Sequence, residues 1–189
     1  MSLPEILLLA VGLSMDTFAV AVCAGLGLKK VSVKNTLIIG GYFGLFQAAM
    51  PLAGFMLAAR FTVWVNALDH WIAFVLLGFI GVRMILSSQK KEAPCEQAPV
   101  FAVVPRSMIP LALATSIDAL AVGVSFAFLE VEIIPAVVYI GVVTLVVAMV
   151  GVKIGQAFGT RFRRKAELAG GIILVLLGAR IFLGGIGVL

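Results

Sequence analysis

The stretch that decides the fold is residues 13–20, which read LSMDTFAV, because it returns as TSIDALAV at residues 115–122. Ser, Asp, Ala and Val recur at matching positions, 102 residues apart. Two further pairs of segments repeat in the same order, at offsets of 101 and 97 residues: 54–61 with 155–162, and 81–86 with 178–183. Three repeated segments in a constant order predict a duplicated unit; the alternative is chance similarity between apolar helices.

The chain around these repeats is too apolar for a soluble domain. Hydrophobic residues make up 62% of its 189 residues and charged residues 12%, with a mean hydropathy of +1.20, whereas soluble domains are about 45–50% apolar and about 25% charged. A membrane span needs about 20 apolar residues, so we expect an all-α integral membrane protein with six transmembrane helices. The predicted spans are residues 4–27, 36–59, 68–87, 107–129, 133–158 and 167–188. Pro4, Pro110 and Pro135 are each expected near a helix start, where a missing N–H costs little.

The duplicated unit holds three of these spans. Residues 1–87 are predicted to form the first repeat and residues 107–189 the second, joined by a polar, proline-bearing linker at 88–106. Because three is odd, the second unit enters the membrane from the opposite side, which gives inverted-topology repeats. Many transporters use this arrangement, with the substrate site near the midplane where the repeats meet.

The basic residues predict an orientation. Ten of the 14 Lys and Arg residues lie in the first, third and fifth predicted loops, and one lies in the other loops. By the positive-inside rule the odd loops are cytoplasmic and both termini are extracytoplasmic. In so apolar a chain, the net charge of +5 is better explained by topology than by nucleic-acid binding. The first 27 residues are expected to be a retained helix, because Glu5 and no basic residue precedes the apolar run.

Two acidic residues lie near the middle of predicted spans. Asp16 and Asp118 occupy matching repeat positions, and an ionised carboxylate at a span centre costs about 2.5–3.5 kcal/mol even on the lenient insertion scale. Small residues share the helical face of each aspartate, which permits close helix approach and predicts that the two carboxylates face each other. The alternative is a structural ion pair with Arg83, Lys153 or Arg180.

Facing carboxylates repel, so a cation between them, or a proton on one of them, is expected. Gln47 is a third candidate ligand, because Pro51 leaves the Gln47 carbonyl without its helical partner. The alternative is a kinked helix in which Gln47 bonds to a neighbour. Four hydroxyl-bearing residues are secondary candidates for lining the site: Ser14, Thr115, Ser116 and Thr144. Such oxygen ligands suit Mg²⁺, Ca²⁺ and Mn²⁺.

Nitrogen and sulfur ligands are not favoured by the pattern. Cys23 and Cys95 have no metal-binding spacing and form no disulfide framework, and Cys23 is expected to pack as a small apolar residue. His70, the single histidine, is expected at the outer interface of the third span.

Several motifs together resemble the manganese efflux pump family, MntP. They are Ser14-Met15-Asp16, Phe43–Gln47 with Met50–Leu52, His70–Phe74 and Ala114–Ala119. The resemblance implies a bacterial inner-membrane exporter of Mn²⁺ that has two inverted three-helix repeats. In it Mn²⁺ is the transported substrate, lipid surrounds the protein, and no cofactor is needed. The family's motif aspartates fall on Asp16 and Asp118. Some members carry Glu where this chain has Gln47, which removes one charge from the site.

Two other functions remain open from the residues alone. An exporter of another cation or small solute could share this scaffold, although the negative central charges favour a cation. An intramembrane aspartyl protease would also use two acids, but the Gly-x-Gly-Asp sequence typical of those enzymes is absent, and we expect no enzyme. No nucleotide-binding motif is present, which indicates that the membrane potential or a proton gradient supplies the energy.

Overall fold

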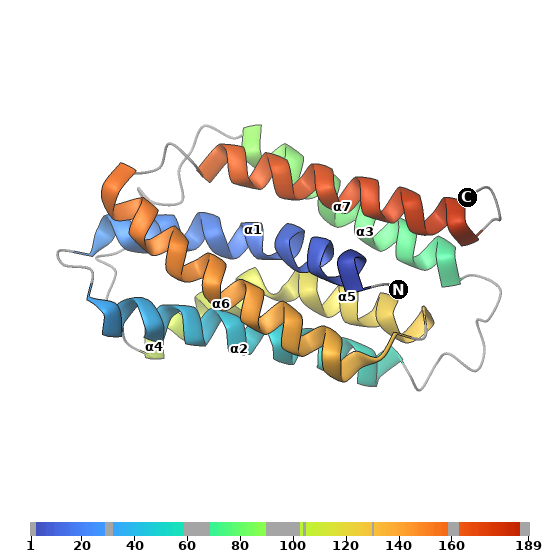
Figure 1. The fold of residues 1–189 in the computed structure, drawn as a ribbon, viewed down its shortest axis with the longest axis horizontal. Helices are drawn as coiled ribbons and strands as arrows, with labels where there is room; N and C mark the ends of the chain where they lie inside the picture. The colour runs from blue at the N-terminus through green and yellow to red at the C-terminus, as the bar shows by residue number, and fades with distance from the viewer. Residues whose placement is uncertain are drawn as a thin grey trace.

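The fold is given by a computed structural model that describes residues 3–28, 32–58, 69–89, 103, 105–129, 131–158 and 163–185. Within these ranges every regular element is an α-helix (Figure 1). The helices are α1 Leu3–Gly27, α2 Val33–Ala58, α3 Asp69–Gln89, α4 Pro105–Thr115, α5 Ile117–Phe128, α6 Ile133–Phe158 and α7 Arg163–Gly185.

Five of the six predicted helical segments are confirmed by α1, α2, α3, α6 and α7, whose ends differ from the prediction by at most four residues. Pro4 and Pro135 lie in the first turns of α1 and α6, as expected. The prediction of one continuous helix over 107–129 is wrong, because α4 and α5 are bent by 43° at a break between them. Pro110 is also not near a helix start, since α4 begins at Pro105.

The break has a local cause in two neighbouring hydroxyl residues. The hydroxyl oxygens of Thr115 and Ser116 both lie within hydrogen-bond distance of the carbonyl oxygen of Ala112, at 3.0 and 2.8 Å. The Ser116 amide, which an α-helix would bond to the same oxygen, donates instead to Leu113 O at 3.1 Å. Side-chain hydroxyls compete with backbone amides for carbonyls and bend helices, so the Thr115–Ser116 pair accounts for the bend.

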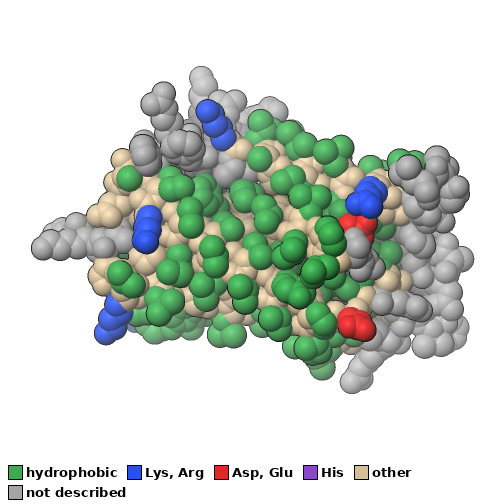
Figure 2. Space-filling model, in the orientation of Figure 1, with side chains coloured by type: hydrophobic (Ala, Val, Ile, Leu, Met, Phe, Trp, Pro, Cys, Tyr) green, Lys and Arg blue, Asp and Glu red, His purple; other side chains and the backbone are tan. Residues whose placement is uncertain are grey.

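The capacity to cross a membrane differs among the helices. By length and composition, α1, α2 and α6 are each long and apolar enough, and the bent α4–α5 pair is a fourth candidate if it counts as one span. In α3 and α7 the described apolar stretches are shorter, at Phe74–Leu86 and Leu168–Leu183. Figure 2 shows a largely hydrophobic surface with charged side chains toward its ends, which fits a bundle surrounded by lipid.

The helices pack in matching pairs. Helix α1 lies against α6 and α7, while α5 lies against α2 and α3; α2 also packs on α6, and α3 on α7. Figure 1 shows α6 crossing α1. The two termini lie toward the same end of the bundle. If α1 corresponds to α5, α2 to α6 and α3 to α7, each contact has a counterpart.

The two tightest of these crossings bring helix backbones into direct contact. At each one, a Cβ added to either of two glycines would overlap a carbonyl oxygen of the partner helix. The α1–α6 crossing pairs Gly25 with Val152 and Gly155 with Val22, and the α2–α5 crossing pairs Gly123 with Pro51 and Gly54 with Leu120. Only glycine permits such an approach, so these four positions set how closely α1 and α5 approach the rest of the bundle.

Candidate cation site

Gln47 joins three helices near the middle of the bundle. Its side chain, on α2, is fully buried. The Nε2 atom donates to the backbone carbonyl of Leu13 on α1 at 3.3 Å, and the Oε1 atom accepts from the hydroxyl of Ser116, at the α4–α5 break, at 2.8 Å. This side chain therefore ties the Ser14–Asp16 turn of α1 to the segment that carries Asp118.

Asp118 lies in the first turn of α5, directly after the break. Its Oδ1 atom accepts from the Ala119 amide at 2.8 Å, and the helix N-terminus favours a negative charge here. The Oδ2 atom is buried and has no hydrogen-bond partner among the described residues. A carboxylate oxygen that is buried and unbonded is costly and is suited to receive a ligand.

The second aspartate lies within electrostatic range of the first. Asp16 on α1 is partly buried, and its charge acts unfavourably on Asp118 while that of Arg83 on α3 acts favourably. Arg180, a candidate ion-pair partner for the aspartates, instead contacts Glu5 at 3.1 Å near the start of α1. Lys153 is exposed on α6. Asp118 therefore lies within range of the charges of Asp16 and Arg83, and Arg180 is engaged elsewhere.

The hydroxyls predicted to line the site differ in whether they already make a hydrogen bond within the protein. Ser14 donates to Val11 O at 2.9 Å, and Thr115 donates to carbonyls of its own helix. Thr144 on α6 is fully buried and has no hydrogen-bond partner among the described residues. The same is true of Thr17, which the sequence reasoning missed. The available signal was its position directly after Asp16.

The atoms that could bind a metal ion around Asp16, Asp118 and Gln47 are oxygens. Within the described residues no three His, Cys, Asp or Glu side chains form a metal-binding group. Two carboxylates with neutral hydroxyl and carbonyl oxygens remain, a set suited to hard divalent cations. Cys23 is disulfide-bonded rather than a free packing thiol, which corrects the expectation for it. The side chain of His70 and residue Cys95 lie outside the described part of the chain.

The fold and the site define a helical membrane protein with oxygen-bearing side chains in a buried polar centre. The chain belongs to the family described as "Mntp: Putative manganese efflux pump", whose sequence profile matches residues 30–182. This confirms the resemblance found in the sequence motifs.

Curated relatives cover the chain nearly end to end. A "Putative manganese efflux pump MntP" of Desulfitobacterium hafniense is 53% identical over 185 residues, which is 98% of this chain and 96% of the relative. Proteins with the same description in Acetivibrio thermocellus and Mannheimia succiniciproducens are 49% and 47% identical, covering 100% and 97% of this chain and 94% and 97% of the relatives. No solved structure matches the chain significantly.

Proposed function

We propose that this protein exports Mn²⁺ from the bacterial cytoplasm across the inner membrane as a secondary transporter. The family and its curated relatives support manganese as the cargo. The observation that carries the site is the buried Asp118 Oδ2 at a helix break, which has no hydrogen-bond partner among the described residues and lies within range of the charge of Asp16. Broken helices at midplane sites recur in secondary transporters.

The proposed architecture is six spans in two inverted repeats, residues 1–87 and 107–189, joined by the linker 88–106. The packing pairs support it, because α1 meets α6 and α7 as α5 meets α2 and α3. The glycine crossings support it as well, since the α1–α6 and α2–α5 crossings each set two glycines against carbonyl oxygens of the partner helix.

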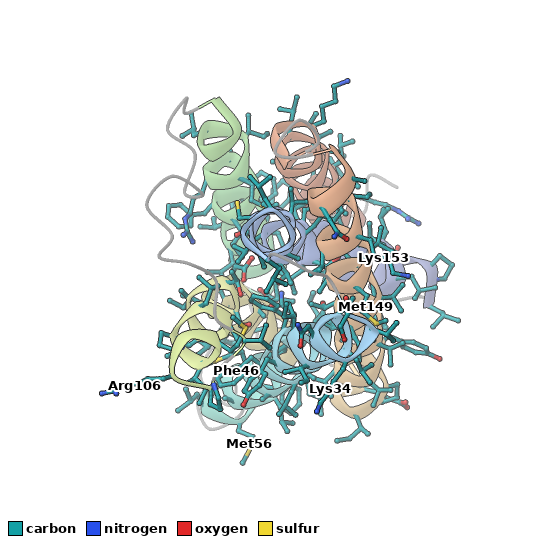
Figure 3. All side chains as sticks on the ribbon, turned by 90° about the vertical axis from the view of Figure 1, so that its left-hand side faces the viewer. Lys34, Phe46, Met56, Arg106, Met149 and Lys153 are labelled. Carbon is teal, nitrogen blue, oxygen red and sulfur yellow. The ribbon has the colours of Figure 1, made fainter. Side chains whose placement is uncertain are left out.

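The proposed orientation places both termini outside. Figure 3 looks onto the left-hand end of Figure 1, and Lys34, Arg106 and Lys153 are seen there around the rim of the bundle. Positive charge gathers on the cytoplasmic side of membrane proteins, so this end is assigned to the cytoplasm. The start of α1 and the end of α7, which lie at the opposite end in Figure 1, then face outward.

In the proposed site, Asp16 and Asp118 supply two negative charges that balance one divalent cation. Gln47 Oε1 accepts from the Ser116 hydroxyl, but that hydroxyl has one proton and lies equally close, at 2.8 Å, to Ala112 O. When Ser116 donates to Ala112 instead, the Gln47 oxygen becomes available as a neutral ligand. Ser14 and Thr115 line the site, and Thr144 offers a hydroxyl that its own helix does not use.

Charge balance also indicates the energy source. A potential that is negative inside opposes cation export by about 2.3 kcal/mol per charge per 100 mV. A cation held by two carboxylates crosses as a neutral unit, and two protons on the return step would keep the cycle neutral. The proposed cycle is therefore exchange of one Mn²⁺ for protons across the same two aspartates.

The test is transport by purified protein in proteoliposomes. Mn²⁺, Mg²⁺, Ca²⁺ and Zn²⁺ fluxes are compared with and without a pH gradient, alongside the Asp118→Asn variant. We expect Mn²⁺ flux that the gradient accelerates and that Asp118→Asn abolishes. Preferred flux of another ion would replace manganese as the cargo, and gradient-independent flux would rule out proton exchange.

A further inference from the structure

Among the described residues, two buried threonine hydroxyls have no hydrogen-bond partner. Thr17 on α1 and Thr144 on α6 are both 0% exposed, and neither Oγ1 atom has a partner among the described residues. A hydroxyl in an apolar setting without a hydrogen bond is costly, and a buried polar group in this condition calls for an explanation.

Other Ser and Thr hydroxyls of the described helices differ from these two, because they donate to a backbone carbonyl nearby. A helical Ser or Thr ordinarily returns its proton to a carbonyl of the preceding turn. In this chain Thr36 donates to Ser32 O, Thr115 to Leu111 O, Ser116 to Ala112 O and Ser125 to Ala121 O. Thr17 and Thr144 do not follow this pattern, so their hydroxyls are left for a partner outside their own helices.

Both threonines lie next to the elements that build the proposed site. Thr17 follows Asp16, and Leu13, one turn earlier on the same helix, receives the Gln47 amide at 3.3 Å. On α6, Thr144 precedes Leu145, whose Cβ lies 3.1 Å from a Cβ placed on Gly44, one turn before Gln47. The helices that carry Thr17 and Thr144 therefore both pack against the part of α2 that carries Gln47.

We propose that the hydroxyl oxygens of Thr17 and Thr144 are ligands of the transported cation, beside the carboxylates of Asp16 and Asp118. This inference rests on the proposed export of Mn²⁺ and names residues of the same site. Neutral oxygens add coordination without adding charge, so the two aspartates still balance a divalent ion. They also suit a hard or borderline-hard ion better than a soft one.

Replacement of Thr by Val separates a ligand from a packing residue, because Val keeps the shape and removes only the hydroxyl. If the hydroxyls serve only packing, Val removes an unsatisfied polar group, which raises the unfolding temperature and leaves Mn²⁺ affinity unchanged. If they are ligands, Thr17→Val and Thr144→Val still raise the unfolding temperature without metal, but weaken Mn²⁺ binding by about tenfold or more, the effect expected for losing a bond to a charged group.

The matched control is Thr36→Val. Thr36 is as deeply buried, on α2, but its hydroxyl is bonded to Ser32 O at 3.1 Å. We expect this variant to gain no stability and to keep wild-type Mn²⁺ affinity. Thr17→Ser and Thr144→Ser retain an oxygen and are expected to keep most of the affinity that the Val variants lose.

Ion selectivity supplies a readout that packing would not move. Thr144→Cys places a soft sulfur where the hydroxyl was, so a ligand role predicts a rise in the ratio of Cd²⁺ to Mn²⁺ affinity in purified full-length protein. The inference would be overturned if wild-type protein transports Mn²⁺ while both Val variants keep its Mn²⁺ affinity and the Cys variant keeps its Cd²⁺ to Mn²⁺ ratio. The proposed export function would then still hold. Wild-type protein that neither binds nor carries Mn²⁺ would overturn both.

Discussion

Replacing Gln47 by Leu removes a side chain that bonds to both α1 and the α4–α5 break, while nearly preserving its volume. The variant loses the bonds to Leu13 O and from the Ser116 hydroxyl. Leu13 O keeps its place in the helix, and Ser116 keeps Ala112 O as an acceptor, so no polar atom on the partners is stranded. The net loss is therefore the bond to Leu13 O, because the Ser116 proton moves to Ala112 O. At about 1 kcal/mol for a hydrogen bond, the expected loss is about 1 kcal/mol, or about 2–4 °C in unfolding temperature for a chain of this size.

The matched variant is Gln47→Glu, which keeps the acceptor for Ser116 and loses the donor to Leu13. Without metal it should be less stable than Gln47→Leu, because a third buried charge lies near Asp16 and Asp118. With Mn²⁺ the order should reverse, because a tighter site gains more stability from ligand binding. We also expect it to turn over no faster, since a tightly held ion leaves slowly.

The assay is thermal unfolding of the purified protein, followed across a Mn²⁺ titration for wild type and both variants. Each titration gives the metal-free stability and an apparent affinity in one experiment. Gln47→Leu with wild-type stability would refute the hydrogen-bond role, and a Gln47→Leu affinity equal to that of wild type would remove Gln47 from the ligand set. Gln47→Glu that gains nothing from Mn²⁺ would place residue 47 away from the ion.

Asp16→Asn should abolish protection of cells against Mn²⁺ at normal expression, because Asn keeps the shape but cannot neutralise a dication; full protection would exclude Asp16 as a required ligand. Reporter fusions should place both termini outside, and a cytoplasmic C-terminus would contradict the inverted repeat. Gly155→Ala should destabilise the bundle by about 1–3 kcal/mol, because its Cβ would meet Val22 O. The control Gly41→Ala, whose Cβ would have no atom within 4 Å, should stabilise α2 by up to about 1 kcal/mol. Equal effects of the two substitutions on the free energy of unfolding would show that the α1–α6 crossing is not tight.

Competing functions make different demands on the same residues. A protease needs two acids that share a water or proton within reach of a peptide bond, whereas an ion carrier needs further oxygen ligands around them. The unbonded oxygens of Thr17, Thr144 and Asp118 are of the second kind. Loss of Mn²⁺ binding on removing a hydroxyl would therefore favour the carrier.

The sequence by itself determined the helices and the residues with chemistry to offer. Burial of about 20 apolar residues per span is a property of local composition, so five helical segments could be placed to within four residues. The charges of Asp16 and Asp118 stood out for the same reason, because each interrupts an apolar run. Those inferences need no knowledge of which helices touch.

Only the tertiary structure decided how those residues are used. The break at Ser116 depends on competition for a single carbonyl, that of Ala112, and apolar periodicity does not register which donor wins. The role of Gln47 as a link between α1 and the break depends on a contact across 69 residues of chain. The hydroxyls of Thr17 and Thr144 have no partner among the described residues. Whether a side-chain hydroxyl makes a hydrogen bond depends on its rotamer and on its neighbours in space, and the order of the residues gives neither.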